Sequence, residues 1–345
     1  MRILGPTKVE VSGKILTSFA GTNYLGLSFH PNILAALTQS TQQSGLGLGA
    51  SRKTTGTTEE VLALEQKLAH FTGAESAIAT TSATLANIGV IEGLHSAIDH
   101  WLIDEQAHTS FANFLPLSGA SVHRYKHLDP QDLARQLAPL QGKVGIFTDT
   151  VFALTGEIAP LQQIADAAPN ALLVFDEAHS IGAFGRGLVA EAGLYTPRTL
   201  VTTTFTKALG CVGGAILGPR PLIEKIRDRS AILAATSALP PALSSAVIAA
   251  IQVLKDEPQR QARLHSNCRI MRESLGLPSQ APAAPIFSKL DHAAELSSQA
   301  HDAGFLVPVL SSYPGSAPGG MLRWIVSSEH TEAEIRTVSA ILSRL

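Results

Sequence analysis

Several classes of protein need features that this sequence lacks. Its 345 residues include only two cysteines, Cys211 and Cys268, which lie far apart without metal-binding spacing and are expected to be reduced. Charged residues make up only 16%, and 26 basic against 28 acidic side chains give a net charge of −2, without a basic block for a nucleic acid. No apolar run approaches the roughly 18 residues that a membrane span needs. We therefore expect a globular protein with no metal, nucleic-acid or membrane partner.

The start of the sequence also lacks the long apolar stretch of a signal peptide, so we expect a cytoplasmic protein. Apolar residues make up 45% of the chain, enough for a large core and for two domains. Strand-like and helix-like stretches alternate from 70 to 218, which is typical of a mostly parallel central sheet flanked by helices. The expected fold class is therefore α/β, with an N-terminal segment (1–40), a large domain (41–240) and a smaller α+β C-terminal domain (241–345).

Shorter patterns predict individual elements. Alternating residues on either side of a Ser-Gly-Lys turn predict a hairpin over 9–17. Helices are expected over 32–40 and from 243 to about 275. The apolar run 319–326 predicts a strand that contains a single arginine, Arg323. Because burying an unpaired arginine is costly, this side chain needs either an acidic partner or the carboxylate of a ligand.

One lysine follows a strand-like run and has unusual neighbours. Lys207 lies in the stretch 203–214, among threonine, alanine and glycine residues and without a carboxylate beside it in the sequence. In a tight and partly dry pocket the pKa of a lysine falls, and its amine becomes a usable nucleophile. Taken alone, a lysine after a strand is more often a solvated surface residue, so this pattern needs a second signal.

The second signal is an acid at the end of another apolar run. Residues 171–175 are apolar and precede Asp176, which predicts a buried parallel strand with the carboxylate at the end where open α/β sheets bind ligands. Asp176 and Glu177 could instead form a helix N-cap pair. A lysine for a Schiff base, an aspartate for a pyridinium nitrogen and His179 one helical turn after Asp176 together indicate a pyridoxal 5'-phosphate (PLP) site.

These two stretches resemble the α-oxoamine synthases, a group of fold-type I PLP-dependent enzymes. The resemblance rests on Asp-Glu-Ala-His-Ser with the glycines that follow (176–187) and on Thr-Phe-Thr-Lys-Ala-Leu-Gly (204–210), and it extends from about Asn23 to the C-terminus. It implies a fold-type I transferase with PLP as cofactor and a homodimer whose active site is shared between subunits. It also implies condensation of an amino acid with an acyl-CoA or a carrier-bound acyl thioester, with loss of CO₂, to an α-amino ketone.

The resemblance implies roles for several single residues. Lys207 matches the Schiff-base lysine, which is also placed to move the proton at the substrate Cα. Asp176 matches the partner of the ring nitrogen, His108 matches the histidine that stacks on the ring, and His179 is expected to donate to the phenolic oxygen. Arg323 matches the arginine that binds the substrate carboxylate, for which a bidentate guanidinium is well suited.

Further residues match positions that bind the cofactor phosphate or line the substrate pocket. A strand, a small-residue turn and a helix start occur over 76–85, and the first-turn N–H groups of such a helix form an anion site. The resemblance places the PLP phosphate there, although a plain helix cap would use the same groups. The additional cofactor-binding residues that it implies are Ser82, Ala83, Thr84, Thr204, Thr236 and Ser237, the last two reaching the phosphate of the neighbouring subunit. The substrate-binding residues that it adds to Arg323 are Thr22 and Asn23.

Three positions differ from the residues that are usual in the family. Thr22 stands in place of an asparagine, Thr84 in place of an aromatic residue and Ala153 in place of a serine. Other PLP chemistry on the same fold, by an aminotransferase or by a lyase or aldolase, therefore stays open, because it begins with the same Schiff base. A non-catalytic PLP-binding scaffold is a third hypothesis, and the presence of Lys207 together with Arg323 argues against it.

Overall fold

A seven-stranded sheet forms the centre of the computed structural model, which describes residues 1–279, 282–311 and 320–343. Six of its strands run in the same direction, five of them as parallel neighbours, and β10 is antiparallel to both of its neighbours. The strands in spatial order are β4 (Ser76–Thr80), β10 (Gly214–Gly218), β9 (Thr199–Thr204), β8 (Leu172–Asp176), β7 (Val144–Asp149), β5 (His100–Asp104) and β6 (Ser121–Tyr125). The prediction of a mostly parallel sheet is confirmed.

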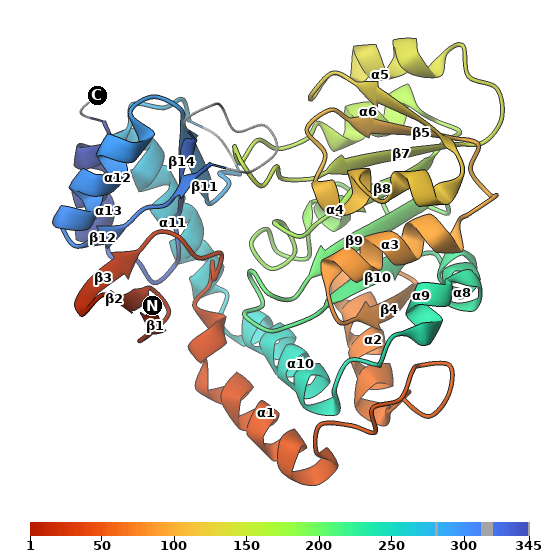
Figure 1. Cartoon of the computed structure of the whole chain (residues 1–345), viewed down its shortest axis with the longest axis horizontal. Helices are drawn as coiled ribbons and strands as arrows, with labels where there is room; N and C mark the ends of the chain where they lie inside the picture. The colour runs from red at the N-terminus through yellow and green to blue at the C-terminus, as the bar shows by residue number, and fades with distance from the viewer. Residues whose placement is uncertain (280–281, 312–319, 344–345) are drawn as a thin grey trace.

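Both faces of this sheet are buried, because successive side chains of each strand point to opposite sides. On β5, Leu102 belongs to one apolar cluster and Ile103 to the other. Phe147 of β7 stacks on Phe111 with ring centroids 3.7 Å apart. The helices around the sheet (Figure 1) are α2 (Glu59–Thr72), α3 (Ala83–Gly93), α4 (Thr109–Ala112), η2 (Leu115–Ser118), α5 (Pro130–Leu137), α6 (Leu161–Ala167), α7 (Leu188–Glu191), α8 (Arg220–Arg229) and α9 (Ala231–Ala235).

A second group of elements, at the left of Figure 1, contains the first strands and the last helix of the chain. The predicted hairpin over 9–17 is confirmed as β2 (Lys8–Val11) and β3 (Lys14–Ser18), and β1 (Arg2–Ile3) pairs with β2. Strand β12 (Phe305–Leu306) pairs in parallel with β3, so the first and last parts of the chain lie side by side. The remaining elements here are β11 (Ile286–Lys289), β13 (Val309–Leu310), β14 (Met321–Ile325), α11 (Gln259–Ser274), α12 (Ala293–Asp302) and α13 (Glu332–Leu342).

Two long helices, α1 (Pro31–Ser44) and α10 (Pro241–Asp256), lie below the sheet in Figure 1, and η1 (Leu27–Phe29) precedes α1. We expected one helical stretch from 243 to about 275. Most of it is helical, but it was wrong to expect a continuous stretch, because α10 and α11 are separate helices. The chain leaves helical geometry at Glu257, whose φ is −124° and ψ 58°, directly before Pro258. A proline disfavours helical geometry in the residue that precedes it, which accounts for the break.

The helices within the described ranges include none that is both long and apolar enough to cross a membrane.

Candidate active site

Four parallel strands end in polar residues at the same edge of the sheet. Asp104, Asp149, Asp176 and Thr204 are the last residues of β5, β7, β8 and β9. Asp149 and Asp176 lie opposite each other in the strand register. Burial raises the pKa of Asp149 well above its usual range, and the neighbouring charge of Asp176 raises it further. The fold therefore concentrates carboxyl groups at the edge where α/β sheets bind ligands.

Hydrogen bonds fix both carboxylate oxygens of Asp176, which is only 3% exposed. Oδ1 accepts from the backbone N–H of Ala178 at 2.9 Å, and Oδ2 accepts from Nδ2 of Asn87 at 3.1 Å. The Asn87 amide also donates to Oγ of Ser110 at 2.9 Å, and that hydroxyl lies 2.7 Å from Nδ1 of His108. Asn87 and Ser110 thus connect the predicted Asp176 and His108, and the sequence analysis missed both. The sequence signal for Asn87 is a polar side chain at the centre of a mostly apolar helix.

Lys207 lies in the turn after β9 and faces a buried histidine. Its Nζ is 2.7 Å from Nε2 of His179, and Nδ1 of His179 is 2.5 Å from the hydroxyl of Tyr24. Burial lowers the pKa of Lys207 to about 8, which outweighs the opposite effect of the Asp176 and Asp149 carboxylates. A large fraction of the Lys207 amine is therefore neutral at mildly alkaline pH, and this is the form that reacts with an aldehyde.

Burial also keeps the two histidines of the site uncharged. It lowers the pKa of His179 well below the usual value, and the positive charges of Lys207 and Arg323 lower it further. The pKa of His108 falls for the same main reason, against the raising influence of Asp176. His108 begins α4, and its backbone N–H donates to Oδ2 of Asp149 at 2.8 Å. Neutral imidazoles can accept or donate one proton each, so both suit proton movement near a reacting atom.

Arg323 lies in β14 and brings a positive charge to this group of residues. Its charge lowers the pKa of Lys207, of His179 and of Tyr24, so its guanidinium lies near all three. Its buried Nε has no hydrogen-bond partner among the described residues. An unsatisfied donor of this kind is suited to a carboxylate ligand. Position 319 of the expected strand lies outside the described residues, and β14 begins at Met321.

The turn from β4 into α3 presents a helix N-terminus to the solvent. Oγ of Ser82 accepts from the backbone N–H of Leu85 at 3.1 Å, and Ser82 and Thr84 are exposed while Ala83 is half-buried. Strand β10 packs closely against this turn, because a Cβ at Gly214 would lie 2.6 Å from the backbone nitrogen of Ala83. The arrangement fits an anion such as a phosphate, as the sequence predicts.

Three other predicted residues use their side chains for contacts within the chain. The Thr204 hydroxyl donates to the carbonyl oxygen of Gly213 at 3.1 Å. Nδ2 of Asn23 donates to Oγ of Ser28 at 2.8 Å, and the adjacent Thr22 is half-buried. The Thr236 hydroxyl donates to the carbonyl oxygen of Ile232 at 2.7 Å.

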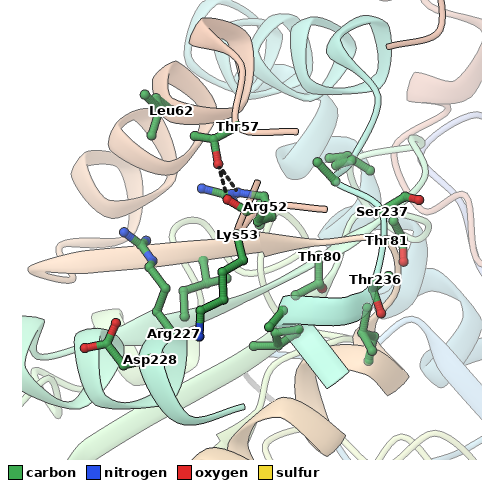
Figure 2. Close-up of a pocket in the computed structure, with 17 residues that line it drawn as sticks. Arg52, Lys53, Thr57, Leu62, Thr80, Thr81, Arg227, Asp228, Thr236 and Ser237 are labelled. Carbon is green, nitrogen blue, oxygen red and sulfur yellow. Dashed lines mark hydrogen bonds between the residues drawn. The ribbon is translucent and has the colours of Figure 1, made fainter. Parts of the chain in front are cut away.

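Thr236 and Ser237 line a pocket beside the turn from β4 into α3, since Thr81 of that turn lines it too (Figure 2). This pocket has a volume of about 270 Å³ and combines apolar residues with basic side chains such as Arg52 and Lys53. Lys207 does not line it, and neither do the other three predicted catalytic residues. The structure thus brings Lys207, Asp176, His108, His179 and Arg323 together, and it leaves Thr236 and Ser237 apart from them within one chain.

The site fits PLP and an amino acid. The Lys207 amine suits the aldehyde of PLP, Asp176 suits its ring nitrogen, and the exposed start of α3 suits its phosphate. Arg323 suits the carboxylate of the amino acid. The comparisons with known proteins agree. Residues 14–342 match the family model "Aminotransferase class I and II". A putative 8-amino-7-oxononanoate synthase of Phenylobacterium zucineum is 36% identical over 99% of this chain and 92% of its own length. The 8-amino-7-oxononanoate synthase of Methylobacterium radiotolerans is 35% identical over 96% and 89%, respectively.

Solved structures with the same fold carry related names. A serine palmitoyltransferase from S. paucimobilis with a bound PLP–myriocin aldimine has a TM-score of 0.92 and 28% identity, covering 99% of this chain and 90% of its own. The 8-amino-7-oxononanoate synthase of Francisella tularensis has a TM-score of 0.83 and 25% identity, covering 95% and 97%. The chain therefore belongs to the aminotransferase class I and II family and, within it, to the α-oxoamine synthases, which are PLP-dependent acyltransferases that condense an amino acid with an acyl thioester.

Proposed function

We propose that this protein makes 8-amino-7-oxononanoate from L-alanine and a 6-carboxyhexanoyl thioester, with release of CO₂ and the free thiol. The product is the one named in its relatives at 33–36% identity. The chemical formula of this product indicates the two substrates. A nine-carbon acid with a ketone at carbon 7 and an amine at carbon 8 contains a seven-carbon acyl group. The two remaining carbons are those that alanine keeps when its carboxylate is lost.

The observation that carries this proposal is the position of the Lys207 amine. It is half-buried, its pKa is lowered to about 8, and it lies 2.7 Å from the ring of His179 rather than in an ion pair with a carboxylate. Asp176 is close enough to act on its pKa, and so is Arg323. A nucleophilic amine near a buried acid and near an arginine whose Nε has no partner among the described residues supports amino-acid chemistry on PLP.

When bound, PLP supplies an electron sink for the negative charge that develops at the substrate Cα. We infer that Lys207 would hold the aldehyde group of PLP and that its amine would be placed to move the proton at the substrate Cα. Asp176, held by its two hydrogen bonds, would face the ring nitrogen and keep it protonated. The exposed start of α3 at Ser82 would bind the phosphate, and Arg323 would hold the carboxylate of the amino acid. His108, which is neutral, would stack on the ring and help to place the proton.

We further propose a homodimer in which the active site is shared. The support is the position of Thr236 and Ser237, which match cofactor-binding residues in the resemblance and yet line a pocket apart from Lys207. If the Lys207 site uses these hydroxyls, we propose that a second copy supplies them. Sedimentation equilibrium of the full chain with PLP should give the mass of a dimer. A mass of 36.3 kDa, that of one chain, would contradict the shared site.

The function can be tested with the purified full chain loaded with PLP. L-Alanine and 6-carboxyhexanoyl-CoA are expected to release free thiol, measured with a thiol-reactive dye, and to give 8-amino-7-oxononanoate, identified by mass spectrometry. L-Serine with palmitoyl-CoA is the competing substrate pair, chosen because serine palmitoyltransferases share the fold. Product from that pair alone would replace the proposed substrates, and release of pyruvate without thiol would indicate transamination instead.

A further inference from the structure

Tyr24 belongs to a buried hydrogen-bonded series that ends at the amine of Lys207. Its hydroxyl lies 2.5 Å from Nδ1 of His179, and Nε2 of the same ring lies 2.7 Å from Nζ of Lys207. Tyr24 is fully buried, and its backbone is fixed from the other end of the chain. Its carbonyl oxygen accepts from the N–H of Ser328 at 2.8 Å and from Oγ of Ser327 at 3.1 Å. The phenol is therefore held in place against the histidine.

The hydrogen bond of the buried Tyr24 phenol determines which ring nitrogen of His179 carries the proton. Burial raises the pKa of Tyr24 and lowers that of His179, so a neutral phenol meets a neutral imidazole with a single N–H. If the phenol donates to Nδ1, the imidazole proton is on Nε2 and points to Lys207. If Nδ1 donates instead, the phenol proton loses the only acceptor that the described residues give it. Leaving a buried donor unsatisfied costs about 1–3 kcal/mol, which favours donation by the phenol.

We propose that Tyr24 is a positioning residue that holds His179 as the Nε2–H tautomer and so favours the neutral amine of Lys207. An Nε2–H group donates a hydrogen bond, and only an uncharged amine can accept it. A neutral amine is also the form that attacks an aldehyde, so the arrangement promotes loading of the cofactor. This inference deepens the proposed function and rests on its assignment of Lys207 as the reacting amine.

Other charged and titratable groups face the series from several elements and stay in place when the Tyr24 hydroxyl is removed. Asp176 of β8 and Asp149 of β7 raise the pKa of Lys207, and Arg323 of β14 lowers it. His108, directly before α4, lowers the pKa of His179. Cys268 of α11 acts on Tyr24. A change caused by Tyr24→Phe therefore reports on the hydroxyl and not on these neighbours.

The test measures the pKa of Lys207 in the full chain after PLP has been removed. Trace acetic anhydride reacts with the neutral amine only, and mass spectrometry gives the labelling of Lys207 across pH. The midpoint of this curve reports the pKa, whereas its plateau reports access to the amine. In Tyr24→Phe the imidazole is free to accept from a charged Lys207, so the midpoint should rise by about one unit, and labelling at pH 8 relative to the plateau should fall roughly five-fold.

Two controls separate this effect from a loss of packing. Tyr125→Phe removes another buried phenol, on the edge strand β6 at 1% exposure, and should leave the Lys207 midpoint unchanged. In a His179→Gln background, Tyr24→Phe should cause no further shift, because the hydroxyl acts through the ring. An unchanged midpoint in folded Tyr24→Phe would overturn the proposal, and so would an equal shift in the His179→Gln background.

If Tyr24→Phe does not fold, a measurement on the unmodified protein can still contradict the proposal. Nitrogen-15 chemical shifts of labelled histidine distinguish the two neutral tautomers, with His179 assigned by comparison with His179→Gln. We expect a protonated Nε2 on His179, and a protonated Nδ1 would overturn the inference. Neither measurement uses a thioester, so failure of the condensation assay and failure of this proposal are distinguishable.

Discussion

The side-chain amide of Asn87 donates to Oδ2 of Asp176 at 3.1 Å and to Oγ of Ser110 at 2.9 Å. A single buried residue of α3 thus fixes the carboxylate at the end of β8 and the start of α4. Replacing it with a similar apolar shape, Asn87→Leu, would leave a buried charge with one hydrogen bond fewer. Loss of a bond to a charged group costs about 1.5–3 kcal/mol, so we expect the affinity for PLP to fall roughly 10- to 150-fold in an absorbance titration.

The matched control for this substitution is Asn267→Leu. Asn267 is also a buried asparagine that donates two hydrogen bonds, at 2.9 Å each, but its acceptors are the carbonyl oxygens of Ser327 and His330. This variant should unfold at a lower temperature with unchanged affinity for PLP. Equal loss of PLP affinity in both variants would show that Asn87 acts through general stability alone.

Lys207→Ala should remove the visible absorbance of bound PLP that depends on a covalent link to the amine, and with it the thiol release. The exposed Lys255 on α10 provides the control, and Lys255→Ala should keep both. Full turnover in Lys207→Ala would contradict the assignment of Lys207 as the reacting amine.

The same variant loses an amine whose pKa burial lowers to about 8. Its ligand-free form should therefore be at least as stable as the ligand-free wild type at pH 7.

Arg323→Ala should raise the KM for the amino acid and affect the KM for the thioester less. The lost group is a charged donor that binds a carboxylate, which corresponds to about 1.5–3 kcal/mol or roughly 10- to 150-fold. Arg336→Ala is the control, because Arg336 is exposed on α13 and its ion pair within the described part of the chain is with Glu332 of the same helix. If initial rates give the same amino-acid KM for Arg323→Ala and the control, Arg323 does not bind this substrate.

Gly214→Ala should disturb the turn that is expected to bind the phosphate. The added Cβ would lie 2.6 Å from the backbone nitrogen of Ala83 and 2.7 Å from the carbonyl carbon of Ser82, so β10 or the start of α3 has to move. Overpacking of this kind costs about 1–3 kcal/mol, and we expect weaker PLP binding with a lower melting temperature. Gly21→Ala adds the same methyl group at a position where no atom of another described residue, apart from its chain neighbours, lies within 4 Å. The affinity for PLP and the melting temperature should both stay at the wild-type values.

His330 should make the protein sensitive to acid. It accepts from the N–H of Ser327 at 3.1 Å, lies 3.0 Å from the carbonyl oxygen of Ser18, and its pKa is lowered by burial to about 4. The unfolded chain therefore binds a proton before the folded one does, and stability that is present above pH 6.5 is lost as the pH falls to 4. The contribution is up to about 3 kcal/mol.

Urea unfolding between pH 7.5 and 4.5 can test this dependence. His330→Gln should be less stable at pH 7 but should lose less stability on acidification than the wild type does. The exposed His292 at the start of α12 supplies the comparison, and His292→Gln should keep the wild-type slope. Identical slopes in all three proteins would rule out His330 as the group responsible.

Local patterns in the sequence predicted much of the architecture, because caps, turns and apolar runs act over a few residues. The Thr58 side chain caps α2, and Thr331 begins α13 with a capping box that includes Glu334. Asp176 was placed at the end of a buried strand from the apolar run before it. The break between α10 and α11 was missed, because residues compatible with a helix continue after Pro258, although they are polar whereas those of α10 are mostly apolar.

The sequence alone thus determined the α/β fold, the family and the cofactor, and it identified Lys207 as the candidate for the reacting amine. Only the tertiary structure decided which distant groups act on that lysine. Tyr24 and His179 are 155 positions apart, and Asn87 and Asp176 are 89 positions apart. A buried polar side chain must find a partner, but its identity depends on how helices and strands from distant parts of the chain pack together. That packing brings the Tyr24 phenol to His179 and the Asn87 amide to Asp176, and no local spacing in the sequence specifies either contact.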